Sequence, residues 1–445
     1  MRLKLIGNGT LITLNSSDPV INDGAVLIDE GLIKDYGKTD ELKVRYQEAD
    51  FKDVKGKVIM PGMINTHMHF YSTFARGMDL KTDIPPSNFE EILEKLWWRL
   101  DSTLNSEDIY YSTLYALVES IRSGTTTIFD HHASYGYIEN SLDIISEAVI
   151  KTKLRASLSY EVSDRHGSQK TEEAIKENER FINRSKSLNS DFITPAIGLH
   201  ASFTLSDETL REVAELAEST NTPTHFHAAE GKVDQTDSKK RGYKNLVDRF
   251  DQLNILKEDS LAIHGVHLSE EEYEILANNG VFLIHNPESN MNNAVGAVNL
   301  QKAIDKNLTI GLGTDGYTTD MFESINVADL LQKHDNLNPK LGGEVIHKLA
   351  FENNRQIAQN YFGKELGIIK KEVPADIIIL DYKPPTPVTD ENYFYHMIFG
   401  FNGGLVDTTI VNGHVLMENQ EVKVLDYEKT IQKCQKQAND FWRRF

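Results

Sequence analysis

Residues able to bind a metal ion or to move a proton stand at the ends of five short apolar runs in this 445-residue chain. The runs cover residues 63–69, 225–230, 261–264, 282–285 and 309–315. A catalytic metal ion takes about three or four protein ligands of this kind and keeps one position open. Ligands that lie far apart in the sequence but always follow strands indicate a barrel with its active site on the rim. The pattern therefore predicts a catalytic metal site on such a rim.

The middle of the chain alternates strand-like and helix-like segments, as a barrel requires. Besides the five runs, buried strands are predicted at residues 126–130, 154–160 and 195–200. Helical patterns lie between them, for example at 107–120 and 141–151, and Ser206 is placed to cap a further helix. Eight strand–helix units favour an α/β fold, a closed (β/α)8 TIM-like barrel. An open doubly wound sheet is the alternative, but no Gly-rich phosphate loop follows the first strand.

Both ends of the chain have a different sequence pattern, in which short β-rich runs are separated by turn residues. Examples are 11–14 and 24–28 near the start and 375–381 and 406–416 near the end, where Asn412-Gly413 is a hairpin-turn signal. We therefore predict a small β-sandwich domain from residues 1–57 plus 368–425, a barrel at 58–367 and a C-terminal helix at 426–445. Two unrelated flanks are the alternative.

Composition restricts the partners and the compartment. The formal net charge of −20 argues against nucleic acid or an anionic membrane surface as a partner, because both attract clustered Lys and Arg. Cys434 is the only cysteine, which excludes an intrachain disulfide and a thiolate zinc site. The N-terminus lacks a signal-peptide pattern and no run reaches the ~18 apolar residues of a membrane span. The expectation is a cytoplasmic protein.

His67 and His69 are two residues apart, so on a strand both imidazoles point to the same side and can bind one ion. A solvated pair of strand-end histidines is the alternative explanation. The preceding Pro61-Gly62 and the residue Asn65 argue against it, because Pro-Gly-x-x-(Asn/Asp)-x-His-x-His is the first-strand motif of the amidohydrolase superfamily. The chain resembles that superfamily from this point on.

The resemblance covers nearly the whole chain and is to the aminohydrolase/chlorohydrolase (deaminase) branch, most of all to its SsnA group. The motifs that carry it are 225–230, the histidine at 264, the His-Asn-Pro-x-Ser-Asn segment at 285–290 and Gly-Thr-Asp-Gly at 313–316. The resemblance implies four metal ligands, which are His67, His69, His227 and Asp315. It implies three catalytic residues, with Glu230 as the proton shuttle, His264 facing the substrate and Asp315 accepting a proton.

Two departures from the family pattern affect the prediction. Where two-metal members carry a bridging lysine, this chain has His200, so we expect one divalent metal ion. Zn²⁺ is expected, and Fe²⁺, Mn²⁺ and Ni²⁺ remain open because a His/Asp set accepts them too. Related deaminases also carry a lysine after the seventh strand, where this chain has Asn292-Asn293.

These parts suit hydrolysis. A bound cation lowers the pKa of its water from about 15.7 toward about 7, so hydroxide is available to attack an sp² carbon that bears an amino group. We predict hydrolytic deamination of a small nitrogen heterocycle such as a purine, a pterin or a nucleoside-like compound. Cleavage of a C–Cl, alkylamine or cyclic amide bond on a similar ring remains open. A non-catalytic scaffold or a structural metal site is disfavoured, because the ligands and the shuttle are all present.

Substrate contacts are harder to predict, because specificity in barrel enzymes depends on the loops. Four residues are predicted to bind substrate: Arg76, His131, His200 and Asn290. Glu161 and Asp164 are further candidates after the third strand. Trp97 and Trp98 are expected in the core, although the loop from Phe70 to Trp98 could cover the rim as a lid. The sequence leaves open which of His131, His132, His267 and His285 face the site. The family also suggests a homodimer.

Overall fold

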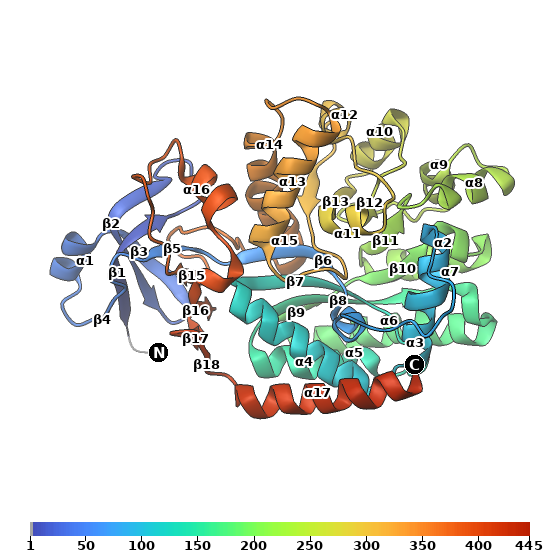
Figure 1. Cartoon of the computed structure of the whole chain (residues 1–445), viewed down its shortest axis with the longest axis horizontal. Helices are drawn as coiled ribbons and strands as arrows, with labels where there is room; N and C mark the ends of the chain where they lie inside the picture. The colour runs from blue at the N-terminus through green and yellow to red at the C-terminus, as the bar shows by residue number, and fades with distance from the viewer. Residues whose placement is uncertain (1–2) are drawn as a thin grey trace.

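The computed structural model describes residues 3–445, and a parallel eight-stranded barrel forms its centre (Figure 1). The barrel strands follow one another in chain order: β6 (Met63–Met68), β7 (Thr125–His132), β8 (Arg155–Val162), β10 (Ile197–Ala201), β11 (Thr224–Ala228), β12 (Leu261–His264), β13 (Phe282–His285) and β14 (Ile310–Leu312). Short β9 (Ile193–Pro195) pairs with β8. Every barrel strand is buried along its length because helices cover the outside, as parallel sheets require. The predicted (β/α)8 fold is confirmed.

The barrel closes between its last and first strands, at the edge where the predicted site lies. The backbone N–H groups of Thr314 and Asp315 donate to the carbonyl of His67 at 3.0 and 2.9 Å. Nδ2 of Asn65 donates to Oγ1 of Thr314 at 2.8 Å, which adds a side-chain connection. Closure therefore brings residues from opposite ends of the barrel sequence into contact.

The outer layer consists of helices that begin at the predicted signals. Ser206 accepts a hydrogen bond from the N–H of Thr209 at 3.1 Å and so caps α7, while Asn105 and Asp108 form a capping box on α4. The helices of this layer are α4 (Ser106–Ser123), α5 (Ser141–Thr152), α6 (Ser168–Leu188), α7 (Asp207–Thr220), α8 (Lys232–Lys240), α9 (Leu246–Gln252), α10 (Glu270–Asn278), α11 (Pro287–Asn292), α12 (Leu300–Asp305), α13 (Met321–Asp335), α14 (Glu344–His347) and α15 (Asn354–Phe362). Among residues 3–445, no helix is long and apolar enough to cross a membrane.

The two ends of the chain build one nine-stranded sheet beside the barrel (Figure 1). Its strands are β1 (Lys4–Ile12), β2 (Val20–Asp29), β3 (Leu32–Lys38), β4 (Asp50–Asp53), β5 (Val58–Pro61), β15 (Ile377–Leu380), β16 (Val406–Val411), β17 (His414–Glu418) and β18 (Glu421–Val422), with α1 (Thr39–Arg45) packed on one side. Ile6 and Val26 from the start share an apolar cluster with Ile377 and Ile410 from the end. The region predicted as a β-sandwich thus forms one continuous sheet, and residues from both ends of the chain share its apolar core.

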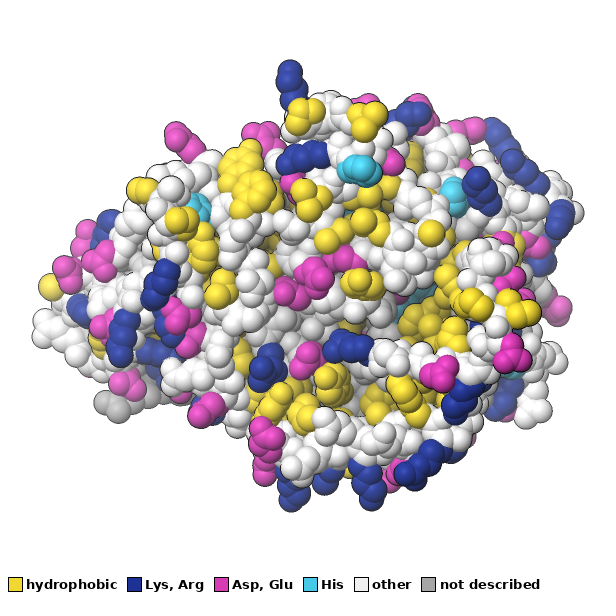
Figure 2. Space-filling view, viewed as in Figure 1, with side chains coloured by type: hydrophobic (Ala, Val, Ile, Leu, Met, Phe, Trp, Pro, Cys, Tyr) yellow, Lys and Arg dark blue, Asp and Glu magenta, His cyan; other side chains and the backbone are white. Residues whose placement is uncertain are grey.

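The division into domains remains a prediction, and strand pairing places one element differently. We assigned residues 58–61 to the barrel, but β5 pairs with β1 and β15 in the terminal sheet, because the chain reaches the barrel only at β6. Helix α16 (Tyr393–Gly400) lies against α13, where Nδ2 of Asn326 donates to the carbonyl of Ile398 at 2.8 Å. Acidic and basic side chains are interspersed over the face in Figure 2, which also shows a hollow lined by hydrophobic side chains.

A segment between β6 and α4, residues 70–103, lies over the strand ends, and we call it the cover segment. It contains a 3₁₀ turn (Phe70–Ala75), α2 (Phe89–Ile92), a π-helical turn (Leu93–Trp97) and α3 (Trp98–Thr103). The C-terminal helix α17 (Tyr427–Arg444) packs on α4 and holds this segment (Figure 1). Nε1 of Trp442 donates to the carbonyl of Phe74 at 2.9 Å, and the Arg99 guanidinium stacks 4.1 Å from the Phe445 ring centre.

Candidate active site

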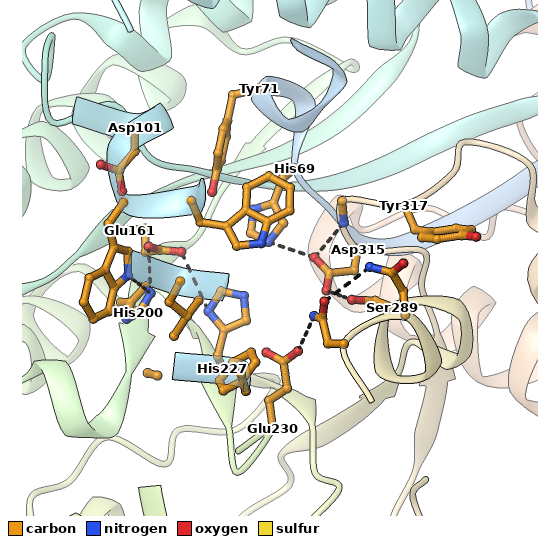
Figure 3. Close-up of a pocket in the computed structure, with 18 of the residues that line it drawn as sticks. His69, Tyr71, Asp101, Glu161, His200, His227, Glu230, Ser289, Asp315 and Tyr317 are labelled. Carbon is orange, nitrogen blue, oxygen red and sulfur yellow. Dashed lines mark hydrogen bonds and ion pairs between the residues drawn. The ribbon is translucent and has the colours of Figure 1, made fainter. Parts of the chain in front are cut away.

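The four predicted metal ligands meet at the C-terminal ends of β6, β11 and β14. Nε2 of His69 lies 3.1 Å from Oδ1 of Asp315, and Nε2 of His67 lies 3.7 Å from the same oxygen. These three residues each offer a ligand atom within 4.8 Å of the others, and His67, His227 and His264 do the same. Figure 3 shows His69, His227 and Asp315 facing one space. Residues separated by more than half the chain therefore form one cluster.

The donor atoms of this cluster fit a divalent cation. Nε2 of His67 is buried and has no hydrogen-bond partner among residues 3–445, while its Nδ1 is 2.9 Å from Nε2 of His225. Burial lowers the pKa of His67 to about 3 and holds the pKa of His227 well below its usual value, so both imidazoles are neutral. Neutral imidazoles and a carboxylate are ligands that divalent metals prefer in catalytic sites.

Neighbouring groups fix the orientation of the candidate ligands. Oγ of Ser289 donates to Oδ2 of Asp315 at 2.6 Å, and Nδ1 of His69 bonds the carbonyl of His131. Asp315 itself has a left-handed backbone with φ of 56°, which a non-glycine residue adopts only where surrounding contacts enforce it. The contacts with His67 that close the barrel supply that enforcement.

A second set of groups, Glu230, His264 and Asp315, lies beside the ligands and can transfer protons. Oε2 of Glu230 lies 3.2 Å from Nε2 of His264, and Oδ2 of Asp315 lies 3.6 Å from the same nitrogen. Nδ2 of Asn293 donates to Oε1 of Glu230 at 2.9 Å. Nε2 of His264 is buried without a hydrogen-bond partner among residues 3–445, so it is available to a bound molecule.

The pKa values of the two carboxylates of this set are shifted in opposite directions. Burial raises the pKa of Glu230, which favours the protonated form that a proton donor needs. Burial acts on Asp315 in the same direction, but the neighbouring imidazoles of His67 and His69 outweigh it and hold the pKa of Asp315 well below its usual value. Burial lowers the pKa of His69, but Asp315, Glu161 and the carbonyl of His131 together outweigh burial and bring it to about 9. A bound cation would have to displace that proton.

The cluster opens into a pocket whose empty volume is about 760 Å³, open solvent included. The cover segment supplies apolar walls, and the ends of β8, β10 and β11 and the segments after β11, β13 and β14 supply polar ones. The lining residues that the argument uses below are Trp97, Trp98, Asp101, Glu161, His200 and Asp234. Trp97 and Trp98 were expected in the core, with a loop over the rim as the alternative; they line the pocket, because the cover segment folds back over the strand ends.

The four predicted substrate contacts fall in different places. His200 lines the pocket, with its Nε2 at 3.5 Å from Nε1 of Trp98. Arg76 lies in adjoining cavities instead, half-exposed and 4.0 Å from Glu119, because the chain turns outward after the 3₁₀ turn. Asn290 sits behind His264, where its Oδ1 is 2.8 Å from Nδ1 of the histidine. His131 is buried beneath the ligands, stacked at 4.5 Å on His225.

None of the four histidines left open by the sequence lines this pocket in the described part of the chain. His132 points away, with its Nε2 at 2.9 Å from Oγ of Ser134, and His285 is fully buried. His267 is half-buried outside the pocket. Residues that the sequence analysis did not assign to the site take their place: Tyr71, Asp101, Ser289, Asn293 and Tyr317. Ser289 belongs to the seventh-strand motif and Asn293 follows it closely, so the motif was a usable signal.

The family of the chain follows from sequence comparison. The model of the amidohydrolase family matches residues 58–416, and the chain belongs to this family. A 5'-deoxyadenosine deaminase from Methanosarcina mazei is 34% identical over 445 residues, covering 98% of each chain. A 5-methylthioadenosine/S-adenosylhomocysteine deaminase from Pyrococcus furiosus is 33% identical over 434 residues, or 96% of this chain and 98% of the relative. The protein is an enzyme, a hydrolase acting on carbon–nitrogen bonds other than peptide bonds.

Solved structures share the fold. An adenosine deaminase from Xanthomonas campestris with bound zinc superimposes with a TM-score of 0.87 at 21% identity, covering 99% of this chain and 98% of that one. Atrazine chlorohydrolase TrzN from Arthrobacter aurescens TC1, complexed with zinc, gives a TM-score of 0.81 at 20% identity, covering 98% and 99%. Family membership and the ligand cluster together make this a divalent-metal enzyme. The narrower resemblance to the SsnA group remains a prediction.

Proposed function

We propose that this enzyme deaminates a nucleoside-like aminopurine by hydrolysis. The observation that carries the proposal is the contact of Glu230 with His264 and of His264 with Asp315 at the edge of the ligand cluster. A protonatable carboxylate and an ionised carboxylate then flank the same imidazole, as a reaction needs when it must both donate and accept protons. The relatives named for the deamination of adenosine derivatives support this class of substrate.

One divalent ion, which we propose to be Zn²⁺, would be held by His67, His69, His227 and Asp315. Bound there, it would supply a nucleophilic hydroxide at neutral pH by lowering the pKa of water. The zinc in two similar folds and the absence of thiolate ligands near the cluster are consistent with this choice. His200 at the position of a bridging lysine supports a single ion.

The chain's own groups have separate roles in the proposal. Glu230 donates a proton to the ring nitrogen, for which its raised pKa is suited, and after it has regained a proton released by the attacking water it donates again to the departing amine. Asp315 accepts a proton from the attacking water. His264 forms a hydrogen bond to the oxygen that becomes attached to the ring carbon. A positioned acid–base pair of this type contributes roughly 10²–10⁴ in rate.

The test is ammonia release from a panel of purines, pterins and nucleosides by the metal-loaded enzyme. Ammonia from a nucleoside-like aminopurine, lost in Glu230→Gln, is the expected result. No ammonia from any panel member, by protein shown to hold its metal, would refute the proposal. The same acid–base set could then expel chloride or an alkylamine or open a cyclic amide, and those substrates would be tested next.

A further inference from the structure

The carboxylate of Glu161, at the end of β8, faces the pocket from the side of His227 that is remote from Glu230 (Figure 3). Glu161 is only 2% exposed, yet its side chain lines the pocket. Neither the ligand cluster nor the proton-transfer set uses this group. It is therefore a buried carboxyl group on the substrate's side of the site without an assigned role.

No residue in 3–445 donates a hydrogen bond to this carboxylate. Four possible donors surround it, all beyond hydrogen-bonding distance. The nearest is Nδ1 of His131 at 3.5 Å. Nη2 of Arg165, Nε2 of His200 and Nδ1 of His227 each lie at 3.7 Å. Arg165 is instead committed to Asp101, whose Oδ2 accepts from Nη2 at 2.9 Å. Two carboxylates thus face one guanidinium, and the unsatisfied one is Glu161.

Other carboxylates on the wall already have protein donors. Oδ1 of Asp234 accepts from Oγ of Ser202 at 2.8 Å, and Oε1 of Glu230 accepts from Asn293 at 2.9 Å. A buried carboxylate without a donor costs free energy, so its presence indicates a donor that arrives with a ligand. No Lys or Arg from residues 3–445 lines this pocket, so an anionic ligand group placed beside Glu161 would have no lysine or arginine partner in the lining.

We propose that Glu161 is a specificity-determining residue that accepts a hydrogen bond from a hydroxyl or amino group of the substrate. The donor belongs to the part of the substrate beyond the reacting ring, since the ring must lie at Glu230 and His264. This inference rests on the proposed deamination of a nucleoside-like compound. It restricts the substrate to molecules with a neutral or cationic donor in this position and excludes those with a phosphate or carboxylate there.

A cycle that combines one protein change with single-hydroxyl changes in the substrate tests this inference. The kcat/KM for ammonia release is measured with adenosine, its 2'-, 3'- and 5'-deoxy analogues and adenosine 5'-phosphate, for wild type, Glu161→Gln and Asp234→Asn. We expect that removal of one of the hydroxyls lowers kcat/KM about tenfold or more in wild type and in Asp234→Asn. In Glu161→Gln the same removal should lower kcat/KM much less. The ratio of kcat/KM for adenosine to that for adenosine 5'-phosphate should also be smaller in Glu161→Gln than in wild type.

Three results would overturn the inference. Glu161→Gln could lower kcat/KM equally for every compound, which would indicate a role in folding or in orienting His227. Removal of each hydroxyl could lower kcat/KM by the same factor in wild type and in Glu161→Gln. Metal analysis could find two ions in wild type and one in Glu161→Gln, which would assign the carboxylate to a second cation. If no compound releases ammonia, the proposed deamination is refuted independently of the role of Glu161. The same comparison is then made with dissociation constants, measured by calorimetry for the same compounds and the metal-loaded proteins.

Discussion

Oε2 of Glu230 lies 3.2 Å from Nε2 of His264, and that nitrogen has no hydrogen-bond partner in the described chain. The two groups come from the loop after β11 and the end of β12, adjacent strands that pair in parallel. His264 has a left-handed backbone with φ of 76°, which turns its side chain over the strand ends. The pairing of two neighbouring strands therefore sets the position of the proposed shuttle.

Glu230→Gln should lower kcat for ammonia release by roughly 10²–10⁴, because the amide cannot donate and accept the proton. Metal content and unfolding temperature should stay as in wild type, since glutamine keeps the shape and still accepts from Asn293. Glu212→Gln, the same change on the exposed face of α7, is the matched control. A Glu230→Gln enzyme with near wild-type kcat would remove Glu230 from the mechanism.

Asn290→Ala should lower kcat by about 10–100-fold and leave KM nearly unchanged, because Asn290 orients His264 and does not reach the pocket. The same change made in a His264→Ala background should then have little further effect, since its partner is gone. Steady-state kinetics of the two single variants and the double variant measure this. A rise in KM with kcat preserved would restore Asn290 as a substrate contact.

The ligand cluster could be predicted because its signals are local. His67 and His69 share one strand, and each of His227, His264 and Asp315 lies within or at the end of a segment predicted as a strand. In a parallel barrel all such positions meet at one rim, so chain order alone determines that they converge. The eight strands could be located for the same reason, since each is a short buried run.

The pocket wall could not be predicted, because its shape depends on contacts between distant segments. The cover segment is held by α17 through the hydrogen bond from Trp442 to Phe74, across 368 residues of sequence. Nothing in the local pattern of 70–103 shows that Trp97 and Trp98 turn inward or that Arg76 turns outward. The position of Asn290 likewise depends on which face of α11 packs against β12.

Removing the metal should lower the unfolding temperature and abolish activity, because an ion that binds only the folded protein stabilises it by mass action. His67→Ala should reproduce both effects without chelator, since His67 is central to the cluster and completely buried. His334→Ala, an exposed histidine on α13, is the control. Full metal content in His67→Ala, measured by elemental analysis, would contradict the proposed ligand set.

Glu288→Gln should change the dependence of stability on pH. Burial raises the pKa of Glu288 from 4.5 to about 7 in the folded protein, and both of its carboxylate oxygens lack hydrogen-bond partners in residues 3–445. Between these two values the folded state binds a proton that the unfolded state has released. The free energy of unfolding therefore falls as pH rises from about 4.5 to about 7, by up to about 3 kcal/mol from this group.

Glutamine does not titrate, so the variant should lack this loss. Urea unfolding of wild type, Glu288→Gln and the exposed control Glu212→Gln at pH 5 and pH 8 measures the difference. The stability of Glu288→Gln relative to wild type should be higher at pH 8 than at pH 5, whereas Glu212→Gln should follow wild type. Equal changes with pH in all three proteins would show that Glu288 titrates normally, with its carboxylate reaching water in the folded state.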